Sequence, residues 1–164
     1  MTLLLAFLLA GMANAAPSAP AVSCRLETVA PLRHGGPAVV RLTLANGATR
    51  PKWALRWNTP FEGAWLGTIF TLVGPDSQEV RYQGARVKRG EPDAGDYVEL
   101  PASGAVTATA DLATAYDLSR PGRYELTVSG ALLDVTSDRR AVPRPRDRHR
   151  PAALRCAPLR FELP

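Results

Sequence analysis

The two histidines are the first residues to weigh for chemistry, because imidazole is the commonest side chain for acid–base work and metal binding. His34 lies in a His-Gly-Gly sequence and His149 in Arg-His-Arg, and neither is followed by Glu. A zinc hydrolase of the His-Glu-x-x-His kind needs two imidazoles one helical turn apart and a glutamate that activates water. The sequence therefore predicts no zinc site and no other cofactor.

Other catalytic groups occur in poor surroundings. A Ser-His-Asp arrangement would have to recruit a histidine from a loop segment, and no Gly-x-Ser-x-Gly or phosphate-binding glycine motif is present. The carboxylate pairs Asp93/Asp96 and Glu91/Asp93 share one polar stretch, where two acids are more often solvated than tuned. Asp76 and Glu79 offer too few oxygen ligands for calcium. We therefore expect that the protein is not an enzyme.

The segments around these residues alternate apolar and polar side chains with the period of a β-strand. Such segments span residues 40–44, 53–57, 69–73, 79–82, 106–110, 124–128, 132–135 and 159–163. Turn residues separate them, for example Asn46-Gly47. About eight or nine short strands at this spacing predict an all-β fold, an immunoglobulin-like antiparallel β-sandwich.

One turn sharpens this expectation. Pro121-Gly122 is followed by Tyr124 at the start of an alternating segment. Immunoglobulin-like folds have a tyrosine at the corresponding corner, and its hydroxyl bonds back to the loop backbone. We therefore expect a structural role for Tyr124.

An apolar stretch over residues 2–15 indicates export. It ends in Ala13-Asn14-Ala15, which suits cleavage before Ala16, although no Lys or Arg precedes it. The stretch is too short for a stable membrane anchor; a buried core helix is the alternative. We expect a signal peptide over residues 1–15, a linker over 16–22 and one β-sandwich domain over 23–164, periplasmic or secreted.

The two cysteines fit an exported protein. Cys24 and Cys156 lie near opposite ends of the mature chain, so a disulfide between them would tie the first strand to the last. A lipidated Cys24 and a metal site made from both cysteines are weaker alternatives. We expect the disulfide.

The positive charge is concentrated in one segment. Residues 138–150 hold six arginines against Asp138 and Asp147, in a chain of net charge +5. Prolines interrupt the segment and it has no aromatic residue on which a base could stack. It is typical of an extended, solvated Arg/Pro-rich loop at 138–151. We expect no nucleic-acid partner.

A series of short motifs between Leu55 and Tyr124 resembles a known family. The motifs are Leu55-Arg56-Trp57-Asn58-Thr59-Pro60 with Glu62-Gly63, Ile69-Phe70, Val80-Arg81-Tyr82-Gln83-Gly84, Val87-Lys88-Arg89, Pro92, Asp96-Tyr97-Val98 with Leu100, Tyr116-Asp117-Leu118-Ser119, Pro121-Gly122 and Tyr124. In order and spacing they resemble the N-terminal β-domain of bacterial deuterolysin-type zinc endopeptidases, the aspzincin or peptidyl-Lys metalloendopeptidase group. The resemblance implies a β-sandwich that precedes a catalytic domain. We expect that the present chain lacks that catalytic domain.

The resemblance implies a partner rather than a reaction. A domain that normally sits beside a catalytic domain is expected to keep a surface complementary to it. The expected partner is a protein, by resemblance an exported metalloprotease, held as an inhibitor or folding helper in trans. Two alternatives stay open: a periplasmic or cell-surface accessory or structural module, and a remnant of a protease gene without present function.

Two loops, residues 57–63 and 84–97, are the candidate partner-binding surface, and we expect them at one end of the sandwich. Their candidate contact residues are Trp57, Asn58, Thr59, Pro60, Glu62, Lys88, Arg89, Asp96 and Tyr97. Lys88 and Arg89 would steer an acidic partner by charge. The alternative is structural: a rigid loop with Trp57 anchored in the core, beside a solvated polar loop.

Overall fold

The computed structural model describes residues 22–164. The signal peptide expected over residues 1–15 lies outside the described residues, as does the expected linker up to residue 21. Val22, the last residue of the expected linker, is 2% exposed and belongs to the hydrophobic core. Among the described residues, no helix has the length and apolar character needed to cross a membrane.

The regular structure of the described residues consists of short strands and single turns of 3-10 helix. The strands are β1 Ser23–Thr28, β2 Val39–Ala45, β3 Lys52–Leu55, β4 Phe70–Val73, β5 Tyr97–Leu100, β6 Ala105–Asp111, β7 Gly122–Val128, β8 Ala131–Leu132, β9 Val135–Thr136, β10 Ala152–Ala153 and β11 Leu159–Leu163. The 3-10 turns are η1 Pro60–Glu62, η2 Ala94–Asp96, η3 Leu112–Thr114, η4 Arg139–Ala141 and η5 Arg146–Arg148.

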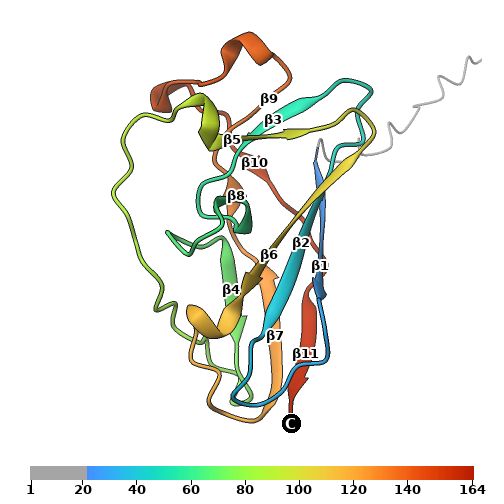
Figure 1. Ribbon diagram of the computed structural model, residues 1–164, viewed down its shortest axis with the longest axis vertical. Helices are drawn as coiled ribbons and strands as arrows, with labels where there is room; N and C mark the ends of the chain where they lie inside the picture. The colour runs from blue at the N-terminus through green and yellow to red at the C-terminus, as the bar shows by residue number, and fades with distance from the viewer. Residues whose placement is uncertain (1–21) are drawn as a thin grey trace, which may run out of the picture.

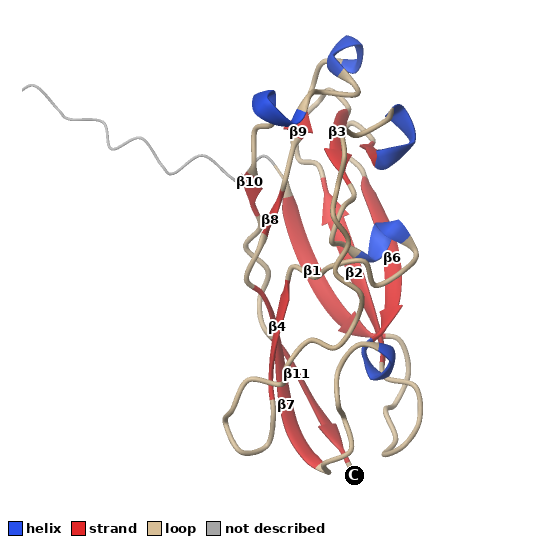
Figure 2. Cartoon of the chain, turned by 90° about the vertical axis from the view of Figure 1, so that its left-hand side faces the viewer, coloured by secondary structure: helices blue, strands red, loops and turns tan. Residues whose placement is uncertain are grey.

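Two antiparallel sheets form the body of the molecule. One has the strand order β1-β2-β6 and the other β11-β7-β4, and they lie against each other in the lower part of Figures 1 and 2. The strands β5-β3-β9 form a third small sheet at the upper end, and β8 pairs with β10. The predicted all-β antiparallel sandwich is confirmed.

The core follows the period-two pattern of the sequence. In β2, Val40, Leu42 and Leu44 are fully buried, while the residues between them are partly exposed. In β7, Tyr124 and Leu126 point inward in the same way. Alternate side chains of a strand face opposite sides of the sheet, so one apolar face from each sheet fills the space between them.

The predicted tyrosine corner is confirmed. The Tyr124 hydroxyl donates a 2.7 Å hydrogen bond to the backbone carbonyl of Arg120, just before the turn. The ring stacks on Phe161 of the neighbouring strand β11, with centroids 5.5 Å apart and planes nearly parallel. Tyr124 therefore fixes both the entry of β7 and its pairing with β11.

The predicted disulfide is also confirmed. Cys24 in β1 is bonded to Cys156, which precedes β11, and 132 positions separate the two in sequence. In the chain-entropy model, closing so long a loop is worth about 4–5 kcal/mol. The bond joins the sheet that contains β1 to the chain segment that enters the opposite sheet.

Three expectations about single strands need correction. Residues 79–82 form no strand and make only isolated bridges, Val73 with Glu79 and Tyr82 with Tyr116. Residues 132–135 are divided between β8 and β9, because Asp134 lies between them with its carboxylate held by hydrogen bonds. Strand β5 begins at Tyr97, the last residue of the expected polar loop 84–97.

Candidate partner-binding surface

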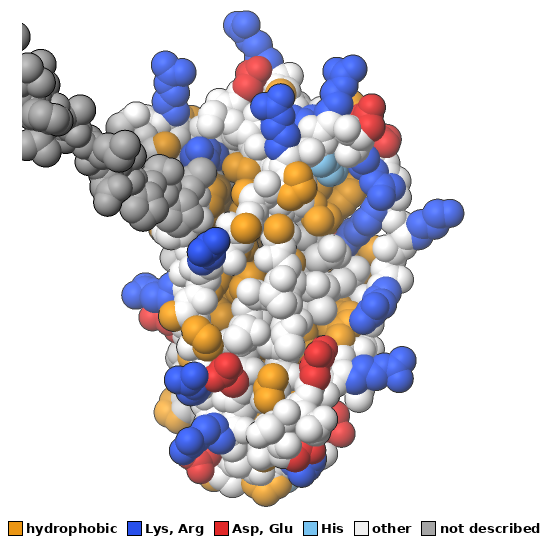
Figure 3. Space-filling model, turned by 180° about the vertical axis from the view of Figure 1, so that it is seen from behind, with side chains coloured by type: hydrophobic (Ala, Val, Ile, Leu, Met, Phe, Trp, Pro, Cys, Tyr) orange, Lys and Arg blue, Asp and Glu red, His pale blue; other side chains and the backbone are white. Residues whose placement is uncertain are grey.

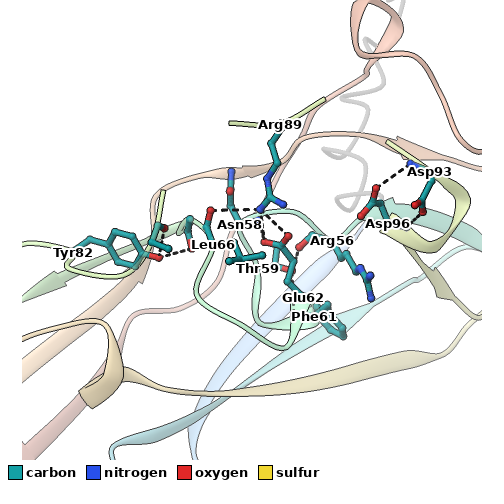
Figure 4. A network of polar contacts seen from close by, with 12 residues as sticks. Arg56, Asn58, Thr59, Phe61, Glu62, Leu66, Tyr82, Arg89, Asp93 and Asp96 are labelled. Atoms are coloured by element: carbon teal, nitrogen blue, oxygen red, sulfur yellow. Dashed lines mark hydrogen bonds and ion pairs between the residues drawn. The ribbon is translucent and has the colours of Figure 1, made fainter. Parts of the chain in front are cut away.

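The two predicted loops meet in space, although twenty residues separate them in sequence. The backbone N–H of Arg56, directly after β3, donates to the carbonyl oxygen of Asp96 at 2.9 Å. The guanidinium of Arg89 reaches across to the carboxylate of Glu62, as Figure 4 shows. Together the loops cover one flank of the molecule rather than its tip, with residues 84–93 along the left edge of Figure 1.

The first loop is a turn specified by its own sequence. Thr59 caps the 3-10 turn η1, since its hydroxyl accepts from the Phe61 N–H at 3.2 Å and donates to the Arg56 carbonyl at 2.5 Å. Pro60 occupies the first turn position and Gly63 closes the turn at a φ of 75°, as their backbone preferences favour. Thr59 and Pro60 are buried, so they support the turn and do not offer a contact surface.

Asn58 has a special backbone geometry. Its φ is 63°, and its N–H donates to the carboxylate of Glu62 at 2.7 Å. Asparagine tolerates this left-handed conformation better than most residues. A side chain at Gly67 would collide with the Asn58 amide, so the two positions are matched. The strain at Asn58 is thus stabilised by Glu62.

Glu62 and Arg89 form the centre of this surface. Their side chains are 6% and 19% exposed, and Nη2 of Arg89 lies 2.7 Å from Oε1 of Glu62. The guanidinium carbon also lies 5.1 Å from the ring centroid of Trp57, in a cation–π contact. Trp57 is 4% exposed, as the structural alternative for this residue expected.

The structure revises one part of the steering prediction. Arg89 is engaged by Glu62 and Trp57 inside the protein, so its charge is not free for an acidic partner. Lys88, its neighbour, is exposed and remains available. An apparent dibasic pair therefore divides into one structural cation and one surface cation.

The end of the second loop is capped and then tied to the interior. Asp93 and Asp96 cap η2 reciprocally, each accepting from the other's backbone N–H at 2.9–3.1 Å. The Tyr97 hydroxyl donates to the carboxylate of Asp134 at 2.9 Å. Burial, with a smaller contribution from Asp134, raises the pKa of Tyr97 to about 12. The proposed contact residues Asp96 and Tyr97 thus hold the loop in place.

The charged residues beneath this surface were not among our predicted site residues. The side chain of Asp134 is fully buried, and its Oδ1 accepts from Nη1 of Arg144 at 2.6 Å and from the N–H of Arg150 at 2.7 Å. His149 Nε2 lies 3.1 Å from the carbonyl oxygen of Arg144, and the His149 and Trp57 ring centroids lie 6.4 Å apart with their planes at 62°. An aspartate within the apolar run Leu132-Leu133-Asp134-Val135 was the sequence signal for this site.

These contacts also refine the prediction for residues 138–151. Most side chains of this Arg/Pro-rich loop are exposed, as expected. The loop is not simply extended, however, because it contains η4 and η5 and is anchored through Arg144 and Arg150 to Asp134. It forms the upper tip of the molecule in Figure 1.

His34 lies apart from this surface, in a groove of about 480 Å³ that Asp117 and Ser119 also line. Its Nε2 lies 2.6 Å from the backbone oxygen of Ser119, not from the hydroxyl, so this contact is not that of a base with its nucleophile. The Asp117 carboxylate accepts from the backbone N–H of Ser119, and hydrogen bonding to Ser119 lowers the pKa of Asp117. Within residues 22–164, no three His, Cys, Asp or Glu side chains are grouped as around a metal ion.

Comparison with known proteins relates this chain to proteases. No protein-family model matches it. It is 35% identical over 124 residues to an extracellular protease of Aeromonas hydrophila, an alignment that covers 74% of this chain and 34% of that protein. It is 28% identical over 101 residues to a neutral protease 2 homolog of Arthroderma gypseum, covering 60% of this chain and 27% of that protein.

The partial coverage limits what these relatives share with the chain. The chain spans about a third of the length of the first protease and about a quarter of the second. The extracellular relative and the Cys24–Cys156 disulfide together indicate an exported protein. Over most of its length, this exported chain is related to one part of extracellular and neutral proteases.

Proposed function

We propose that this domain binds the catalytic domain of a deuterolysin-type metalloprotease after export, as a non-catalytic inhibitor or folding helper. The observation that carries the proposal is the 35% identity over 124 residues to one third of an extracellular protease. We expect a segment that shares a chain with a catalytic domain to have a surface that contacts it. We propose that the domain described here has a surface complementary to such a catalytic domain.

The flank formed by residues 57–63 and 84–97 is the proposed contact surface. Its turns are rigid because Glu62 joins Asn58 to Arg89 by hydrogen bonds of 2.7–2.8 Å. A preorganised surface loses little entropy on binding, which favours affinity. Lys88 and Val87 are exposed on the same loop, and Val87 is 41% exposed, one of only two large apolar side chains so exposed in residues 22–164. A cation beside an exposed apolar side chain suits a protein interface.

The experiment mixes the disulfide-bonded full chain with the separately prepared catalytic domain of the Aeromonas hydrophila extracellular protease. Titration calorimetry is expected to show a complex at micromolar concentrations, and peptidase activity is expected to fall with occupancy. For a folding helper, the readout is instead the yield of active protease after refolding with and without the chain. The chain alone is expected to cleave no protein substrate in the presence of zinc.

Matched variants locate the surface. Lys88→Ala is expected to slow association and to reduce its dependence on salt, since a charge at the rim acts mainly on the association rate. Arg123→Ala, an exposed charge on β7, is the control and should leave the rate unchanged. A complete lack of complex formation, with no change in refolding yield, would reject the proposal in favour of an accessory module. Chelator-sensitive cleavage by the pure chain would reject the non-catalytic role.

A further inference from the structure

The upper tip of the molecule carries a basic groove that the proposed function does not use. The groove has a volume of about 1100 Å³ and lies between the Arg/Pro-rich loop and the end of strand β9. Five arginines, two aspartates and His149 line it, and its lining within residues 22–164 has no Phe, Tyr or Trp. The arginines are Arg50, Arg140, Arg144, Arg148 and Arg150. Basic side chains project around this end in Figure 3.

Most of this positive charge has no internal partner. Of the five arginines, only Arg144 forms an ion pair within residues 22–164, with the buried Asp134. The residues before 22 contain no Asp or Glu, so they supply no further carboxylate. Arg140, Arg148 and Arg150 are exposed, and their guanidinium groups are free to pair with an external anion.

The groove is held in shape from below. Asp134 accepts hydrogen bonds from the Arg144 side chain and the Arg150 backbone, at 2.6 and 2.7 Å. The N–H of Val135 in β9 donates to the Arg150 carbonyl at 3.1 Å. The free guanidinium groups thus extend from a backbone that is already ordered, so binding an anion need not order the loop first.

We propose that this groove binds a carboxylate-rich peptide segment of a protein partner. Guanidinium groups pair with carboxylates through two parallel hydrogen bonds. A volume above the ~300–1,000 Å³ of most small-molecule pockets suits a stretch of chain. The described lining has no Phe, Tyr or Trp, and its one ring, His149, already contacts the Arg144 carbonyl and Trp57. The groove therefore lacks the row of aromatic platforms on which successive bases of single-stranded nucleic acid stack. Asp138 and Asp147 also line the groove. Their carboxylates can accept hydrogen bonds from peptide N–H groups, which a DNA sugar–phosphate backbone lacks.

Identification of that partner as a protease rests on the proposed function, but the acidic class of ligand does not. The test therefore uses a probe without any protease, a short fluorescein-labelled poly-glutamate peptide, with poly-glutamine as its uncharged match. Fluorescence anisotropy with the disulfide-bonded full chain is expected to show binding of poly-glutamate only. The affinity should fall as salt rises from low concentration to ~0.15 M, where the Debye length is about 8 Å.

Two triple variants distinguish binding in the groove from attraction by the net charge of the protein. Arg140→Gln with Arg148→Gln and Arg150→Gln removes three groove charges, and the expected loss of affinity is at least about tenfold. The control removes three exposed arginines elsewhere, with Arg81→Gln, Arg123→Gln and Arg155→Gln, and should lose no more than about twofold. All six side chains are exposed, so both variants should melt within a few degrees of the parent chain.

Several outcomes would overturn this inference. Equal losses in the two triple variants would mean long-range attraction without a site, and no poly-glutamate binding would exclude the site directly. Tighter groove-dependent binding of oligothymidylate or a sulfated glycan would assign the groove to another class of ligand. Poly-glutamate binding in a chain that captures no protease would sustain the groove and reject only the proposed function.

Discussion

Leu126 and Asp134 are both fully buried, yet they lie in different kinds of interior. Leu126 packs between the two main sheets, within a continuous apolar cluster. Asp134 lies beneath the upper loops and is enclosed by Arg144, Tyr97 and the backbone of Arg150. The two main sheets are thus held together by buried apolar area, which tolerates substitutions that conserve volume. The loop end depends instead on one buried charge, and all the partners of that charge must be present.

Removal of the disulfide is expected to have the largest effect, because it acts on the whole chain and not on one region. Cys24→Ser with Cys156→Ser should lower the free energy of unfolding by about 4–5 kcal/mol, since the unfolded chain gains the freedom of an open loop. Urea unfolding gives the value, and far-ultraviolet circular dichroism should remain rich in β-structure. A loss below ~1 kcal/mol would show that the unfolded chain is not restrained by the bond.

Asp134→Ala should follow, at about 3–5 kcal/mol, because it leaves the largely buried Arg144 without its counter-charge. Asp147→Ala, an exposed aspartate of the same loop, is the control and should cost at most ~0.5 kcal/mol. The double variant Asp134→Leu with Arg144→Met should recover only part of the stability. It leaves no unpaired charge, but the Tyr97 hydroxyl and the Arg150 N–H still lose their acceptor. Equal effects of Asp134→Ala and Asp147→Ala would remove the contrast with the apolar core.

Leu126→Ala tests the other interior. A cavity between the sheets should cost about 2–5 kcal/mol, measured by the same urea titration. Hydrogen exchange separates the two regions more sharply than the total energy does. Leu126→Ala should raise exchange throughout β7 and its neighbours, whereas Asp134→Ala should raise it first in residues 138–151. Identical exchange patterns for the two variants would mean that both regions unfold as one unit.

Tyr97 supplies the smallest effect, visible only in alkali. Burial raises its pKa in the folded protein to about 12, above the ordinary value of 10.0. Between about pH 10 and 12, the unfolded chain therefore loses a proton that the folded chain keeps, so stability falls as the pH rises. Tyr97→Phe should make this fall shallower. Tyr82, Tyr116 and Tyr124 also have raised pKa values because of burial, so part of the slope should persist; an unchanged slope would exclude Tyr97 as a contributor.

The sandwich could be predicted from the sequence because each main strand alternates in the same way. The face of the sheet on which Leu42 or Leu126 lies can be predicted from the polar residues next to it in sequence. The disulfide was also predictable, because the chain has only two cysteines. The corner at Tyr124 was predictable because a Pro-Gly turn precedes this tyrosine. Strand β5 was missed because Tyr97-Val98-Glu99-Leu100 follows a polar stretch and pairs with β3, far away in sequence.

The candidate surface was harder to predict, because its residues act through partners from distant segments. Lys88 and Arg89 are adjacent basic residues, and the sequence does not distinguish their roles. In the structure Arg89 pairs with Glu62, whereas Lys88 is exposed. Asp134 gave a signal, an acid within an apolar run, but Arg144 and Tyr97 could not be paired with it from sequence spacing. Long-range ion pairs depend on the fold, which local patterns do not determine.

The Cys24–Cys156 bond has a further consequence for a protein related to proteases. It closes nearly the whole described chain into a covalent ring, so a single cut in any loop between the two cysteines opens the ring without releasing a fragment. A nick after the exposed Lys88 would leave both pieces attached, and their pairing across β2–β6 and β4–β7 would still hold them in register. Such a nicked molecule would run as one band on a gel without reductant and as two with it.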